Sequence, residues 1–227
     1  MNFTVLCVTY KDKELVEKLI KSFEKFKRDT DKVNYIIVEN TLDESNKKYV
    51  EGLSPDLKYI NVPFGEKYNI PSGKSSMGHG MAFEVGKQHV EDEYTFICHS
   101  DCLVTSSEFF NEFENKINEG FELIGVSFDS HPNRIKAIHC SGYMVKTEIL
   151  NSTRMLPILP KIDTTDLVTK YCRDNSKKIY CFRNTYNEKP LVDIINEPFK
   201  SLGPDCGVDR CLDSKNNILY IHQGKKD

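Results

Sequence analysis

The sequence lacks several features that would each indicate a class of protein. Its eight cysteines include no Cys-x-x-Cys pair, so a structural zinc site has little support. No stretch approaches the roughly 20 apolar residues of a membrane-spanning helix, and no single basic run indicates a binding stripe. The net charge of −3 argues against nucleic-acid binding through bulk charge, although it leaves a local basic patch open.

The cysteines are expected to be free thiols, most of them buried. Several lie inside apolar runs, as in residues 5–8 and 96–98, where cysteine behaves as a small hydrophobic side chain. The chain is too long to need disulfides, and no apolar signal segment precedes Phe3. These observations favour a reducing compartment, and we expect a cytoplasmic protein.

The apolar periodicity predicts an α/β fold. With 227 residues, 39% hydrophobic and 29% charged, the chain has an ordinary globular composition and enough length for a sizeable core. Strand and helix patterns alternate, which favours a mostly parallel sheet flanked by helices. Strands are expected at residues 3–8, 35–38, 57–62, 94–98, 123–128, 135–145 and 218–221. Helices are expected after Asp12, at 80–90, at 107–117 and at 164–172, with Asp12 and Asp163 as caps.

The segment at residues 63–78 is expected to be a long loop, because it is rich in proline, glycine and serine. A loop of this length in a compact domain serves as a binding segment or is a simple surface insertion. Its Gly73-Lys74-Ser75 is similar to the end of a P-loop, but Tyr68 stands where the first glycine of that motif belongs. The P-loop interpretation is therefore rejected.

Polar side chains follow three of the expected strands. They are Thr9-Tyr10, Glu39-Asn40 and His99-Ser100-Asp101. Because ligands bind at the carboxyl ends of the strands in an open α/β sheet, these groups are expected to converge on one ligand.

The order and spacing of these segments resemble a known family. The segments are residues 5–10, residues 36–41, Gly78-His79-Gly80 and residues 94–101. Together they resemble the GT-A glycosyltransferases of the inverting family-2 type over the first half of the chain, to about residue 110. The similarity is looser at residues 140–145, 163–164 and 221–224. It implies a single GT-A (Rossmann-like) domain over 1–227, with a nucleotide-sugar-binding half at 1–110 and an acceptor-side half at 111–227.

The resemblance assigns donor-binding roles to the polar strand ends. Thr9, Tyr10, Glu39 and Asn40 would hold the nucleoside, and a carboxylate such as Glu39 suits ribose hydroxyls or a base N–H. The alternative for Glu39 is a polar strand cap. Ser100 and Asp101 would lie at the diphosphate. His79, at a glycine-flanked helix start, would approach a phosphate or would be a plain turn histidine.

The metal site departs from the family pattern. The family binds Mn²⁺ or Mg²⁺ through Asp-x-Asp, whereas this chain has His99 in the first acidic position and keeps Asp101 in the second. His222 lies where the family often supplies a late histidine, although an ordinary surface histidine near the terminus is the alternative. An imidazole ligand favours Mn²⁺ over Mg²⁺.

The implied reaction is an inverting displacement that needs a base to remove the proton of the acceptor. Asp163 is the first choice for that base and Asp166 the second, and helix capping is the alternative for Asp163. The donor would be a nucleotide sugar. The acceptor would be a glycan, a lipid, a protein or a modified nucleobase.

Two other functions remain open. A nucleotidyltransferase is disfavoured because no glycine-rich loop follows the first strand. A non-catalytic nucleotide-sugar-binding module is kept open by His99, which replaces a carboxylate of the metal motif.

Overall fold

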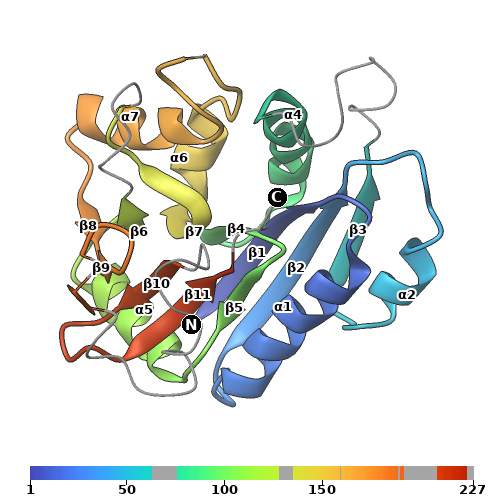
Figure 1. Cartoon of the computed structure of the whole chain (residues 1–227), viewed down its shortest axis with the longest axis horizontal. Helices are drawn as coiled ribbons and strands as arrows, with labels where there is room; N and C mark the ends of the chain where they lie inside the picture. The colour runs from blue at the N-terminus through green and yellow to red at the C-terminus, as the bar shows by residue number, and fades with distance from the viewer. Residues whose placement is uncertain (63–75, 128–134, 159, 189, 192–208, 224–227) are drawn as a thin grey trace.

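The computed structural model describes residues 1–62, 76–127, 135–158, 160–188, 190–191 and 209–223. Helices and strands alternate through most of this part of the chain (Figure 1). In chain order the elements are β1 (Asn2–Thr9), α1 (Lys13–Phe26), β2 (Lys32–Glu39), α2 (Lys47–Glu51), β3 (Leu57–Asn61), α4 (Ser76–Gly86), the 3₁₀ helix η1 (Lys87–His89), β4 (Tyr94–His99), β5 (Cys102–Val104), α5 (Glu108–Asn118), β6 (Leu123–Ser127), β7 (Ile138–Lys146), α6 (Thr147–Ser152), α7 (Asp166–Asp174), β8 (Ile179–Cys181), β9 (Arg183–Asn184), β10 (Asp209–Leu212) and β11 (Ile218–His222).

A seven-stranded sheet in the order β3-β2-β1-β4-β7-β6-β8 forms the centre of the molecule. Strands β3, β2, β1 and β4 run parallel, β7 is antiparallel to both β4 and β6, and β8 is parallel to β6. The expected mostly parallel sheet flanked by helices is therefore confirmed.

Two apolar cores cover the two faces of this sheet, because side chains alternate along each strand. On one face, α1 and α5 pack over β1 and β4, and aromatic side chains such as Phe23, Phe96 and Phe109 dominate. On the other face, α4 packs over Leu6 of β1 and Val38 of β2, and α6 and α7 pack over β7. Figure 1 shows α4, α6 and α7 together on one side and α1 on the other.

A second, four-stranded sheet in the order β5-β11-β10-β9 carries the C-terminal strand back to the end of β4. It joins the main sheet through Tyr220 of β11, whose hydroxyl donates a 2.5 Å hydrogen bond to the carbonyl oxygen of Gly142 in β7. A Cβ atom at Gly142 would lie 2.6 Å from the Tyr220 ring, so glycine is required for this approach.

The structure corrects two of the expected helix starts. Helix α4 begins at Ser76 instead of Gly80, so residues 76–78 are helical and not part of a loop, while residues 63–75 lie outside the described residues. The helix expected at 164–172 begins at Asp166, and its N-cap position is Thr165 instead of Asp163. Asp12 does occupy the N-cap position of α1, but its side chain makes no capping hydrogen bond.

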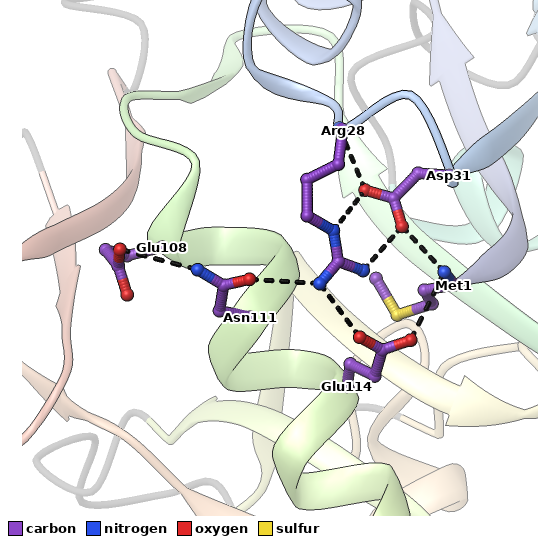
Figure 2. Close-up of polar contacts among 6 residues, drawn as sticks. All are labelled: Met1, Arg28, Asp31, Glu108, Asn111 and Glu114. Carbon is purple, nitrogen blue, oxygen red and sulfur yellow. Dashed lines mark hydrogen bonds and ion pairs between the residues drawn. The ribbon is translucent and has the colours of Figure 1, made fainter.

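A polar network ties the turn before β2 to α5 (Figure 2). The guanidinium group of Arg28 binds both oxygens of the Asp31 carboxylate, at 2.6 and 2.8 Å, and lies 2.8 Å from Glu114 of α5. The amine of Met1 lies 2.6 Å from the same Asp31 carboxylate. Burial alone would raise the pKa of Asp31, but hydrogen bonds from Arg28 and Met1 lower it to about 2.

The cysteine prediction is confirmed for the described residues. None of the seven described cysteines forms a disulfide with another described cysteine, and only Cys181 among them is exposed. Cys206 lies outside the described residues. No helix in the described part of the chain is long and apolar enough to cross a membrane.

Candidate functional site

A cavity of about 420 Å³ opens at the carboxyl ends of β1 and β4. The ends of these two strands, the start of α4, strand β7, the loop before α7 and the end of β11 all contribute to its lining. Its volume lies in the range of roughly 300–1,000 Å³ that small-molecule sites occupy. Four of the six histidines of the chain line it: His79, His99, His139 and His222.

Strand pairing brings together Asp101, near the middle of the chain, and His222, close to its C-terminal end. In the antiparallel β5–β11 pair, His222 lies opposite Cys102, and the amide of Gln223 donates a hydrogen bond to the carbonyl oxygen of Asp101. The Asp101 carboxylate consequently lies 3.3 Å from His222 Nε2. Both side chains are almost fully buried, with 9% and 11% of their surface exposed.

His99 completes a group of three potential metal ligands. It is the last residue of β4, and its Nδ1 atom lies 3.1 Å from His222 Nε2. Ligand atoms from His99, Asp101 and His222 all lie within 4.8 Å of one another. Two ligands at right angles on an ion with bonds of about 2.1 Å lie about 3 Å apart, so these side chains fit a divalent transition metal ion.

The four residues predicted to hold the nucleoside form two pairs, and one pair lines the cavity while the other does not. Thr9 and Tyr10 line the cavity, and the buried Thr9 hydroxyl has no hydrogen-bond partner among the described residues. Glu39 and Asn40 are buried beside them but do not line this cavity. The Glu39 carboxylate accepts a 2.8 Å hydrogen bond from the amide of Lys11, and burial raises its pKa. The nucleoside-binding role of Glu39 and Asn40 stays a prediction.

His79 extends from the first turns of α4 over the metal-ligand group. Its ring centroid lies 5.0 Å from that of His99 and 4.6 Å from that of Phe83. Burial lowers the pKa of His79 to about 4, although the negative charges of Asp163 and Asp101 act in the opposite direction. The imidazole is therefore neutral at pH 7 and would meet a phosphate as a hydrogen-bonding group, without a positive charge.

Asp163 and Asp166, the two candidates for the base, have different surroundings. Asp163 lines the cavity, whereas Asp166 is completely buried and does not line it. The Asp166 carboxylate accepts a 2.8 Å hydrogen bond from the amide of Asp163 and so fixes the backbone there. The Thr164 hydroxyl donates a hydrogen bond to the carbonyl oxygen of Ser76 and attaches this segment to α4.

Sequence reasoning missed several side chains of the cavity, among them His139 and Cys140. The sulfur atom of Cys140 lies 3.1 Å from His99 Nε2, and the His139 ring centroid lies 5.9 Å from that of His99. Both residues belong to the strand pattern at residues 135–145, which predicts a strand and does not indicate a ligand site. The one available signal was the family resemblance at residues 140–145, which begins at Cys140, directly after His139. Ser100, by contrast, was singled out and does line the cavity.

Comparison with known proteins gives a structural answer only. No family model matches the sequence, and no curated protein matches it. Among solved structures, the mannosyltransferase PcManGT from Pyrobaculum calidifontis, in complex with GDP-Man and Mn²⁺, superposes with a TM-score of 0.58 at 16% identity. That match covers 79% of this chain and 54% of the mannosyltransferase.

Two further glycosyltransferase structures give similar matches. TarS from S. aureus matches with a TM-score of 0.57 at 15% identity, over 80% of this chain and 60% of that one. The galactosyltransferase LgtC, in complex with donor and acceptor sugar analogs, matches with a TM-score of 0.56 at 10% identity. That match covers 87% of this chain and 81% of LgtC. This chain thus spans little more than half the length of the first two. The chain has the GT-A fold of the glycosyltransferases.

Proposed function

We propose that this chain is a glycosyltransferase that moves a sugar from a nucleotide-diphosphate donor to an acceptor with inversion at the anomeric carbon. One observation carries the proposal: His99, Asp101 and His222 meet in the same cavity as Asp163, at the sheet edge where α/β proteins bind ligands. The glycosyltransferase neighbours support the choice, because PcManGT was solved with GDP-Man and a TarS structure, at a TM-score of 0.54, with UDP-GlcNAc.

The metal-ligand atoms of this site favour Mn²⁺ over Mg²⁺. Two imidazole nitrogens and one carboxylate oxygen surround it, and Mg²⁺ prefers oxygen ligands alone. When bound, the ion would neutralise charge on the departing diphosphate. His99 would replace the missing carboxylate as a ligand, so its presence does not by itself remove metal binding.

The remaining cavity residues receive roles from their positions. Thr9 offers a buried hydroxyl to the nucleoside, and Tyr10 lies next to it at the cavity wall. Asp163 would accept the proton of the acceptor nucleophile, since among the described residues it is the carboxylate that lines the cavity outside the metal-ligand group. Asp166, the second candidate, is better placed to hold the backbone of Asp163 through its hydrogen bond.

The test separates binding from chemistry with two substitutions. Release of nucleoside diphosphate would be measured with Mn²⁺ and a panel of nucleotide sugars, beginning with GDP-mannose and UDP-GlcNAc, with water as the acceptor. Asp163→Asn is expected to lower turnover by about 10²–10⁴-fold, the usual contribution of a general base, while donor affinity stays unchanged. Asp101→Asn is expected to lose Mn²⁺ binding and turnover together.

Asp174→Asn is the matched control, because Asp174 is 56% exposed at the end of α7, in an ion pair with Lys170. Its turnover should equal that of the unmutated chain. Unchanged turnover in Asp101→Asn would contradict the metal assignment. Donor binding without any turnover by the unmutated chain would favour the non-catalytic binding module.

A further inference from the structure

The two ring nitrogens of His99 lie against different partners. Nδ1 lies 3.1 Å from His222 Nε2, and Nε2 lies 3.1 Å from the sulfur atom of Cys140. We infer that Cys140 is a positioning residue for the metal site, which holds His99 with its Nδ1 atom toward the ion. The inference rests on the metal site proposed above. Cys140 would orient a ligand of this site without binding the ion itself.

The geometry decides which nitrogen of His99 would bind the ion. The Asp101 carboxylate lies 3.3 Å from His222 Nε2, and the same nitrogen lies 3.1 Å from His99 Nδ1. An ion held by all three residues therefore takes Nδ1 of His99 and Nε2 of His222. Nε2 of His99, which faces Cys140, is left to a hydrogen bond.

The protonation of His99 follows from that assignment. A neutral imidazole that binds metal through Nδ1 carries its hydrogen on Nε2. The Nε2–H group then donates to the Cys140 sulfur, which is the acceptor in this contact.

The surroundings of Cys140 suit this role. Cys140 is 5% exposed in β7. The ring of its partner His99 is also enclosed, because the rings of His79 and His139 lie 5.0 and 5.9 Å from it. Metal-binding histidines usually donate their second N–H group to a carboxylate or a carbonyl oxygen. A thiol is a weaker acceptor, so its removal is expected to cost less than the removal of a carboxylate.

The experiment compares metal affinity in four proteins: the unmutated chain, Cys140→Ala, Cys140→Ser and Cys172→Ala. Mn²⁺ dissociation constants would be measured by electron paramagnetic resonance. Cys140→Ala is expected to bind Mn²⁺ about 10-fold more weakly, at the low end of outer-ligand effects. Cys140→Ser keeps an acceptor and should stay within about 3-fold. Cys172→Ala, which removes another buried thiol from the same core and away from the cavity, should bind as the unmutated chain does.

A second readout distinguishes a positioning thiol from a ligand. With Co²⁺, the unmutated chain should show no sulfur-to-cobalt charge-transfer band, because the thiol faces the nitrogen that does not bind metal. A band that disappears in Cys140→Ala would overturn the inference. If Cys140→Ala does not fold, Cys140→Val removes the acceptor with an apolar side chain one methyl group larger and must show the same loss of Mn²⁺ affinity.

The outcomes also separate the inference from the proposed function. Equal Mn²⁺ affinity in Cys140→Ala and in the unmutated chain would overturn the role of Cys140 and leave the metal site standing. An unmutated chain that binds neither Mn²⁺ nor Co²⁺ would overturn the metal site, and the inference with it.

Discussion

The Asp31 carboxylate shows how a single residue links stability to pH. Its side chain has no exposed surface, and Arg28 and the amine of Met1 hold its pKa near 2, below the ordinary 3.8. Because the folded-state pKa is lowered, the stabilisation is complete above pH 3.8 and is lost as the pH falls toward 2. The difference corresponds to about 2 kcal/mol.

We predict that Asp31→Asn lowers the free energy of unfolding by about 2 kcal/mol at pH 7, because Arg28 and Met1 lose one of their two carboxylate partners and keep Glu114. The difference from the unmutated chain should shrink at pH 3 and below. Urea unfolding at both pH values measures it. Asp174→Asn, in the exposed pair with Lys170, should change stability by at most about 0.5 kcal/mol. A loss of stability that does not depend on pH would contradict the assignment for Asp31.

Individual site residues differ in how far the sequence reveals them. Asp101 and His99 follow a clear apolar strand, and that position alone marks them as candidates. Glu39 follows such a strand too, yet its carboxylate binds the Lys11 amide and lies outside the cavity lining. His139 carries no such signal, because it reaches the cavity only through the antiparallel pairing of β7 with β4. Side-chain environments of this kind depend on contacts between distant segments.

Among the elements, β11 matters most to the site because it carries His222. Its position depends on the close contact between Tyr220 and Gly142. Gly142→Ala is expected to destabilise the fold by about 1–3 kcal/mol, as overpacking of a core does. It should also weaken Mn²⁺ binding, since His222 lies two residues beyond Tyr220. Thermal unfolding and a Mn²⁺ titration measure the two effects.

Gly52→Ala is the matched control for that substitution. Gly52 follows α2 with a φ of −77°, and an added Cβ atom would meet nothing closer than 3.4 Å. Stability should be unchanged or slightly higher, because alanine restricts the unfolded chain. A Gly142→Ala protein with unaltered stability and Mn²⁺ affinity would show that β11 does not depend on this contact.

The sequence predicts best those elements that are long enough for a regular pattern of apolar residues to show. Strand β1 and helix α1 are of this kind, and both lie where the pattern places them. Strands β5 and β9, of three and two residues, are too short to show a period and exist through their pairing with β11 and β10. The start of α4 was misplaced because Gly78 and Gly80 suggest a break. Gly80 is instead required by packing, since a Cβ atom there would lie 2.7 Å from the carbonyl oxygen of Met155.

At the scale of the whole molecule, the sheet order explains why distant residues share one cavity. The parallel strands β1 and β4 are neighbours, with Val8 opposite His99, and their ends meet at one edge. The second sheet then returns the C-terminal strand to that edge. The apolar periodicity predicted a mostly parallel sheet but not this return, because pairing between segments more than a hundred residues apart leaves no local pattern. Only the family resemblance placed His222 with Asp101 at the metal site.

The most direct test of the account is the thermal unfolding of the unmutated chain with Mn²⁺ and a panel of nucleotide sugars, repeated with a chelator. A donor present at about 100 times its Kd should stabilise the fold by roughly 2.7 kcal/mol. For a chain of this size that corresponds to a rise in Tm of roughly 5–10 °C. The account predicts this rise with Mn²⁺ and its loss with the chelator. If no nucleotide sugar raises the Tm with Mn²⁺ or with Mg²⁺, the proposed donor site is wrong.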